Sequence, residues 1–161
     1  MSDALALRAA RRDDLDALVA LYVQLNPDNA GTPRDALPAI FERILATDGL
    51  EILVGELAGR IVATCYLNVI PNLTRGGRSY AVIENVVVDA ALRGLGHGRT
   101  LMRHALGRAW AGGCYKVLLQ TGSRDPAVLG FYEACGFSRT DKTGFVAWGP
   151  AATTGRPSTG R

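Results

Sequence analysis

The stretch that most constrains the fold of this chain is a predicted strand that runs into a glycine-rich loop and then into a helix. Three consecutive valines at positions 86–88 indicate a buried strand, and glycines at positions 94, 96 and 98 indicate a turn with bare backbone. Apolar residues then recur at helical spacing from about Arg99 to Ala111. The first N–H groups of a helix have no intrahelical acceptor, so they and the positive end of the helix dipole can face an anion. We therefore expect residues 93–99 to form a phosphate-binding loop, called the cradle below.

The spacing of the glycines narrows the kind of phosphate ligand. A P-loop carries Lys and then Ser or Thr directly after its last glycine, whereas Gly98 is followed by Arg99 and Thr100. The dinucleotide fingerprint G-x-G-x-x-G is also absent, because the order here is G-x-G-x-G. The sequence therefore favours neither a P-loop nor a dinucleotide site.

What is present is Arg-x-x-Gly-x-Gly, formed by Arg93, Gly96 and Gly98. This run resembles the acetyl-CoA signature of the GCN5-related N-acetyltransferase (GNAT) superfamily. The similarity extends from Tyr80 to about Trp148 and includes Gly-Cys-Tyr-Lys-Val-Leu-Leu and Phe-Tyr-Glu-Ala-Cys-Gly-Phe. Those two runs are similar to runs of glucosamine-6-phosphate N-acetyltransferases and of small bacterial relatives. Before residue 80 only the order of the elements agrees.

The resemblance implies acetyl-CoA as cosubstrate and no metal. In the superfamily the pantetheine arm pairs with backbone where two parallel strands splay apart, and the pyrophosphate lies on N–H groups of the following loop. The corresponding cofactor-binding positions here are Val86, Val87, Val88, Arg93, Gly94, Leu95, Gly96, His97, Gly98 and Arg99. Many relatives carry an asparagine before the Phe-Tyr pair that helps hold the cofactor arm, and this chain has Asp125 in that region.

Glu84 is the predicted general base. It interrupts a run of apolar residues, where a carboxylate is costly unless it faces water or a partner. Desolvation there would raise its pKa toward the working pH, which suits a base that acts through water. The alternatives are a carboxylate on a solvated sheet face, one paired with an arginine, or one that only binds the ammonium group of the acceptor. Asn85 points to the opposite face in a regular strand, and a bulge at the splay would change that.

Tyr132 is the predicted general acid, because an unperturbed phenol stays protonated at neutral pH and can donate to a leaving thiolate. A bare aromatic residue is more often part of the core, and the resemblance at Phe-Tyr-Glu favours the catalytic role. The resemblance also implies direct attack of the amine on the thioester, so the three cysteines at positions 65, 114 and 135 are expected to be reduced thiols and not nucleophiles.

The rest of the pattern predicts an α/β fold with a mixed, mostly antiparallel sheet, splayed parallel central strands and helices on both faces. Antiparallel strands are expected from Glu51 to Leu57 and from Arg60 to Val69, joined by a hairpin turn at Ala58-Gly59, and from Tyr80 to Val88. A parallel strand is expected after Gly113. Closing strands are expected at Phe137 and from Phe145 to Trp148. Residues 1–148 are predicted to form a single domain and residues 149–161 a disordered tail.

The predicted function is transfer of an acetyl group from acetyl-CoA to a primary amine, of a small molecule or a peptide. A non-catalytic acyl-CoA-binding or regulatory domain is the alternative. An aminosugar phosphate is a minority candidate for the acceptor, because residues 143–149 contain no basic residue. The net charge of +3 requires no nucleic-acid partner, and no apolar run is long enough for a membrane span, so a cytoplasmic protein is expected. The resemblance leaves a homodimer possible.

Overall fold

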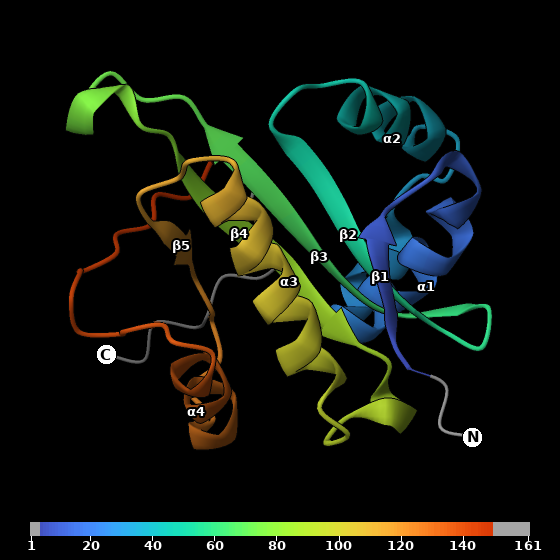
Figure 1. Ribbon diagram of the computed structural model, residues 1–161. Helices are drawn as coiled ribbons and strands as arrows, with labels where there is room; N and C mark the ends of the chain where they lie inside the picture. The colour runs from blue at the N-terminus through green and yellow to red at the C-terminus, as the bar shows by residue number, and fades with distance from the viewer. Residues whose placement is uncertain (1–3, 150–161) are drawn as a thin grey trace.

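The computed structural model describes residues 4–149, which contain a five-stranded sheet (Figure 1). The strands follow one another across the sheet in chain order, and they are β1 (Ala6–Ala9), β2 (Leu50–Leu57), β3 (Arg60–Ile70), β4 (Tyr80–Val88) and β5 (Val117–Leu119). The first four strands are antiparallel, and β5 is parallel to β4. The predicted mixed, mostly antiparallel sheet is therefore confirmed.

Helices cover both faces of the sheet, as the sequence predicts. The four α-helices are α1 (Leu15–Leu25), α2 (Leu37–Leu45), α3 (His97–Ala111) and α4 (Pro126–Ala134). Leu101, Met102 and Ala105 of α3 pack with Leu53 and Ile83 of the sheet in one core cluster. On the other face, side chains of α1 and α2 form a second cluster with β2. The sheet is thus the middle layer of three (Figure 1).

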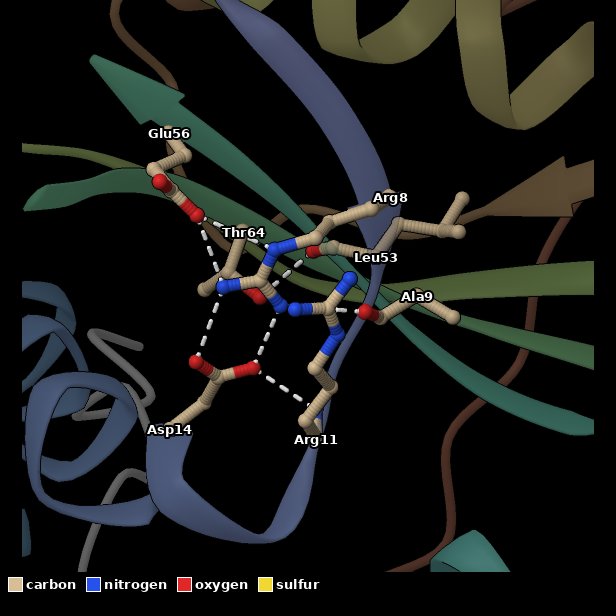
Figure 2. Close-up of polar contacts among 7 residues, drawn as sticks. All are labelled: Arg8, Ala9, Arg11, Asp14, Leu53, Glu56 and Thr64. Carbon is tan, nitrogen blue, oxygen red and sulfur yellow. Dashed lines mark hydrogen bonds and ion pairs between the residues drawn. The ribbon is translucent and has the colours of Figure 1, made fainter. Parts of the chain in front are cut away.

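A partly buried arginine joins the first strand to the elements beside it (Figure 2). Arg8 donates to the carboxylate of Asp14 at 2.6 and 3.0 Å and to Oε2 of Glu56 at 3.0 and 2.8 Å. Asp14 also accepts the backbone N–H of Arg11 at 2.6 Å. The hydrogen bonds from the Arg8 guanidinium hold the pKa of Asp14 below its ordinary value, because their effect exceeds the opposing effect of burial. This contact fixes the start of α1 against β1 and β2.

The predicted closing strands are absent from the described residues. After α4, residues 135–149 run without a strand, and the apolar side chains of Phe145, Val146 and Trp148 are exposed. A strand needs a neighbouring edge that matches its length, and β5 offers an edge of only three residues. The predicted tail begins at Gly149, and its residues 150–161 lie outside the described part of the chain. Within residues 4–149 no helix is long and apolar enough to cross a membrane.

Candidate functional site

The site begins where β4 and β5 part. Only three residue pairs join the two strands, from Ala81 opposite Val117 to Ile83 opposite Leu119, while β4 continues to Val88. Beyond Ile83 the edge of β4 that faces β5 has no strand partner among residues 4–149, which leaves backbone groups there for a ligand to pair with. The splay predicted for the two parallel strands is therefore present.

A β-bulge begins two residues after Ile83, the last residue of β4 that pairs with β5. Tyr66 of β3 is opposite Glu84 and Thr64 is opposite Val87, so Asn85 and Val86 together face one residue, Cys65. Asn85 has a φ of +52°, a left-handed conformation that asparagine tolerates better than most residues. The irregularity that the sequence left open is thus a bulge, and it makes both Glu84 and Asn85 exposed.

Glu84 lies on the face of the sheet that α1 and α2 cover. Its cross-strand neighbour Tyr66 packs against the cluster formed with those helices. Among the described residues its carboxylate forms no hydrogen bond or ion pair within the usual limits. The expected desolvation of Glu84 is wrong, because the side chain is exposed to water. Glu84 is instead a carboxylate on a solvated face of the sheet, and it is free to bind an amine.

Tyr132 lies near Glu84 but on the side of α3 and α4. Its ring packs edge-on against Phe131 at 5.0 Å and Phe137 at 6.3 Å between centroids, and the ring belongs to the partly buried shell of the larger core. Burial raises the pKa of Tyr132 most, and the nearby Glu84 carboxylate also raises it. Its hydroxyl has no hydrogen-bond partner in residues 4–149 and is not sealed from solvent. The phenol is therefore protonated and available to a ligand.

Helix α4 places Tyr132, and Asp125 begins that helix. The Asp125 carboxylate accepts the N–H of Ala127 at 2.8 Å, and Pro126 occupies the first helical position, where its missing N–H costs nothing. In this structure Asp125 thus caps α4 and is engaged by backbone.

The cradle follows β4 through a short turn. Gly94 and Gly96 have φ values of +79° and +87°, and α3 begins at His97, two residues earlier than the helical pattern predicts. The N–H of Thr100 donates to the carbonyl of Gly96 at 3.0 Å, so the preceding N–H groups of the first turn lack helical acceptors. An anion bound at this turn would accept hydrogen bonds from these N–H groups.

Gly98 is the position where the cradle is most tightly packed. A Cβ built on Gly98 would lie 3.2 Å from two ring carbons of Phe131 and 3.3 Å from Cγ2 of Val88. The first turn of α3 therefore touches both α4 and β4. Only glycine lets the three elements approach so closely.

The remaining predicted cofactor positions surround this turn. Val87 is buried, and Val86 and Val88 pack against the larger core. Arg93 is exposed and donates from Nε to the carbonyl of Val88 at 3.1 Å, so part of its guanidinium braces the loop. Leu95, His97 and Arg99 lie at the surface or half-buried, and the Leu95 side chain is 65% exposed.

One contact in this region was missed by sequence reasoning. The side-chain oxygen of Gln24, at the end of α1, accepts the N–H of Ala90 at 2.9 Å, and its amide nitrogen donates to Asp89 at 3.4 Å. Asp89 in turn accepts the N–H of Ala91 at 3.0 Å. Gln24 thus ties α1 to the segment between β4 and the cradle. A glutamine at the end of an apolar stripe gives no signal of a contact so distant in sequence.

The cysteines lie as expected for reduced thiols. Cys65 and Cys114 are buried and Cys135 is half-buried, and none of the three is in a disulfide. Burial raises the pKa of Cys65 to about 12, which keeps it a thiol.

Comparisons with known proteins agree with this geometry. Residues 11–137 match the sequence profile described as Acetyltransferase (GNAT) family. The chain is 43% identical over 87 residues to glucosamine 6-phosphate N-acetyltransferase of Trypanosoma brucei brucei, over 54% of this chain and 57% of that protein. It is 35% identical over 122 residues to glucosamine 6-phosphate N-acetyltransferase 1 of Oryza sativa subsp. japonica, over 74% and 72% of the two chains.

A solved structure agrees over most of its length. A putative acetyltransferase from Agrobacterium tumefaciens str. C58 superposes with a TM-score of 0.85 at 49% sequence identity, and the match covers 89% of this chain and 99% of that one. The fold, the splayed strands, the cradle and the profile match lead to one conclusion: this chain belongs to the GNAT family of acetyltransferases.

Proposed function

We propose that this protein is an acetyl-CoA-dependent N-acetyltransferase that moves the acetyl group directly to the primary amine of a small molecule. The observation that carries the proposal is the opening between β4 and β5, with free helix N–H groups at one end and with the Glu84 carboxylate near the Tyr132 phenol. Family membership supports the same class of reaction.

The residues present fit acetyl-CoA. The unpaired edge of β4 from Val86 to Val88 offers the amide groups that a pantetheine arm needs, and the bare backbone of the cradle offers donors to a pyrophosphate. The free part of the Arg93 guanidinium and the exposed Arg99 would add positive charge beside those phosphates. Acetyl-CoA supplies the acetyl thioester when it is bound. The backbone N–H of Val86, in the bulge, would donate to the thioester oxygen.

Glu84 would receive the acceptor on the other face of the strand. An exposed carboxylate beside Tyr66 can hold an ammonium group, and through a water molecule it can accept the proton that the amine must lose before attack. The alternative is that Glu84 only binds the ammonium, and the pH dependence of a variant distinguishes the two roles.

Tyr132 would supply the proton that the departing thiolate takes up. Its pKa is raised mainly by burial, so the phenol keeps its proton, and its hydroxyl has no competing partner among the described residues. The bond from nitrogen to the acetyl carbon forms while the bond from that carbon to sulfur breaks. One proton leaves the ammonium group through Glu84 before attack. Sulfur takes the proton of Tyr132 as it departs, and the Tyr132 phenolate takes the second proton, which the nitrogen releases after attack.

The acceptor is proposed as a small-molecule amine. Two relatives are named glucosamine 6-phosphate N-acetyltransferases, which makes an aminosugar phosphate a second candidate. The lack of basic residues over 143–149 argues against it. The single domain over residues 1–148, the cytoplasmic location and the absence of a metal stay predictions. A homodimer also stays a prediction, and the exposed Phe145, Val146 and Trp148 are of the kind that a subunit interface would bury.

The test is release of free CoA thiol from acetyl-CoA with a panel of amines that includes aminosugars, aminosugar phosphates, polyamines and peptides. We expect turnover with at least one small amine. Tight binding of acetyl-CoA in calorimetry without turnover on any amine would instead indicate the non-catalytic alternative. No binding of acetyl-CoA would refute both.

A further inference from the structure

Three cations gather around the ring of Tyr115, at the end of the sheet away from the cradle. The guanidinium carbons of Arg75 and Arg78 lie 5.9 and 5.8 Å from the ring centroid, and Nζ of Lys116 lies 5.4 Å from it. Lys116 also lies 5.2 Å from the centroid of Tyr80. These five residues are called the Tyr115 cluster below. They precede or begin β4 and β5, whereas the cradle follows the other end of β4.

No acidic side chain offsets these charges. Within residues 4–149, none of the three cations forms an ion pair with a carboxylate. Residues 71–81 and 112–119, which supply the whole cluster, contain neither Asp nor Glu. The faces of the tyrosine rings attract the cations, but the cations repel one another. An anion bound among them would replace that repulsion with attraction.

The two loops that carry the cluster are held together by backbone. The N–H of Tyr115 donates to the carbonyl of Ser79 at 2.9 Å, and the N–H of Ala81 donates to the carbonyl of Lys116 at 3.0 Å. Arg75 itself has a φ of +57°, a conformation that arginine rarely adopts. The backbone that carries Tyr80, Tyr115 and Lys116 is therefore held in place, which lowers the entropy lost when a ligand binds.

The cluster is too far from Glu84 to serve the same small acceptor. Tyr80 and Glu84 are four positions apart along an extended strand, which is about 13 Å at the usual rise per residue. The guanidinium groups also lie beyond Tyr80, on the loop that precedes β4. A ligand at the cluster would therefore leave the acceptor position free.

We propose that the Tyr115 cluster is a binding site for a compact oligophosphate group, separate from the cradle and from the acceptor position. Two arginine forks and an ammonium group match the oxygens of adjacent phosphates, because guanidinium groups bind phosphate in bidentate geometry and lysine adds a point charge. The site does not depend on the acetyltransferase activity.

The experiment is a titration of the whole protein with sodium tripolyphosphate at low ionic strength, followed by the amide NMR signals. We expect saturable shifts at residues 75–79 and 115–116. Tripolyphosphate also suits the cradle, so the titration is repeated with saturating acetyl-CoA. Shifts at residues 94–99 should then disappear, while those of the Tyr115 cluster should remain.

Charge-removing variants test which residues bind. Arg75→Gln, Arg78→Gln and Lys116→Gln should each weaken binding at the cluster roughly threefold to tenfold. Arg60→Gln is the matched control, because it removes the same charge from an exposed position at the opposite end of the sheet. It should leave the affinity unchanged, and the amide spectrum of each variant reports whether it is folded.

Two results would overturn the proposal. One is a titration in which tripolyphosphate shifts only the amides of the cradle. The other is an equal loss of affinity in Arg60→Gln, which would mean that net charge alone attracts the anion. If acetyl-CoA fails to shift the cradle amides, the proposed enzymatic function is in question, while the shifts at the Tyr115 cluster still decide this inference.

Discussion

Replacing Gly98 with alanine would disturb the contact among the cradle, α4 and β4. The added methyl group would lie 3.2 Å from the Phe131 ring and 3.3 Å from Val88 Cγ2. Ordinary carbon contacts are about 3.5–4.0 Å long, so Phe131 must retreat by at least about 0.3 Å and Val88 by at least about 0.2 Å. The two neighbours belong to different elements, so no single shift of α3 relieves both contacts. Phe131 precedes Tyr132, and its retreat would move the proposed proton donor.

The magnitude follows from two opposing effects. Overpacking of this kind costs about 1–3 kcal/mol. Alanine in place of glycine within a helix returns up to about 1 kcal/mol. Gly107, in the same helix, is the matched control, because a Cβ there would have no other atom within 4 Å. Gly107→Ala should therefore be about 1 kcal/mol more stable than the wild type, and Gly98→Ala about 1–3 kcal/mol less stable than Gly107→Ala.

Urea unfolding measures the two stabilities, and calorimetry measures acetyl-CoA affinity. We expect Gly98→Ala to weaken acetyl-CoA binding and to lower kcat, and Gly107→Ala to change neither. The reasoning would be refuted by a Gly98→Ala protein that matches Gly107→Ala in stability and binds acetyl-CoA as the wild type does.

Four further predictions concern single side chains. Tyr132→Phe keeps the ring but removes the proton donor, so kcat should fall roughly 10²- to 10⁴-fold at unchanged acetyl-CoA affinity, and near-normal turnover would exclude the general acid role. Glu84→Gln should lower the rate at neutral pH with partial recovery at higher pH, as the free amine loses its proton; a raised acceptor KM at unchanged kcat would mean that Glu84 only binds the ammonium. Gln24→Ala should raise the KM for acetyl-CoA more than the KM for the acceptor, because the segment before the cradle loses its tie to α1; equal KM changes would contradict this. The pKa of Asp14 is lowered in the folded protein, so its ion pair with Arg8 stabilises the fold fully above the unfolded pKa near 3.8. This contribution is lost as the pH falls through the lower folded pKa. Urea unfolding between pH 3 and 6 should therefore show a smaller loss of stability at low pH for Asp14→Asn than for the wild type.

Much of the fold could be predicted because its signals are local. β4 spans Tyr80–Val88 as predicted, since a valine run between a glycine turn and a glycine loop allows few other structures. The hairpin at Ala58 and Gly59 was equally clear, and both residues have positive φ, as two-residue hairpin turns require. The cradle followed from the spacing of its glycines.

What could not be predicted depends on contacts between distant segments. Phe145 and its neighbours have the composition of a strand, but pairing depends on a free edge elsewhere in the chain. Helix α3 begins two residues early because Gly96 caps it in a left-handed conformation, which an apolar repeat does not report. The exposure of Glu84 depends on pairing between β3 and β4, and the tie from Gln24 spans 66 residues.

The bulge at Asn85 also determines which face of the sheet each of the three valines at positions 86–88 occupies. Thr64 and Tyr66 share the face under α1 and α2, and they lie opposite Val87 and Glu84 respectively. If the same residues formed a regular strand without the bulge, strict alternation would put Glu84 and Val87 on opposite faces and turn over all three valines. The bulge, in which one residue has a positive φ, thus keeps Glu84 and Val87 on the same face of the sheet. A β-branched residue at position 85 resists that angle, so it would be expected to destabilise the bulge on which the orientation of the three valines depends.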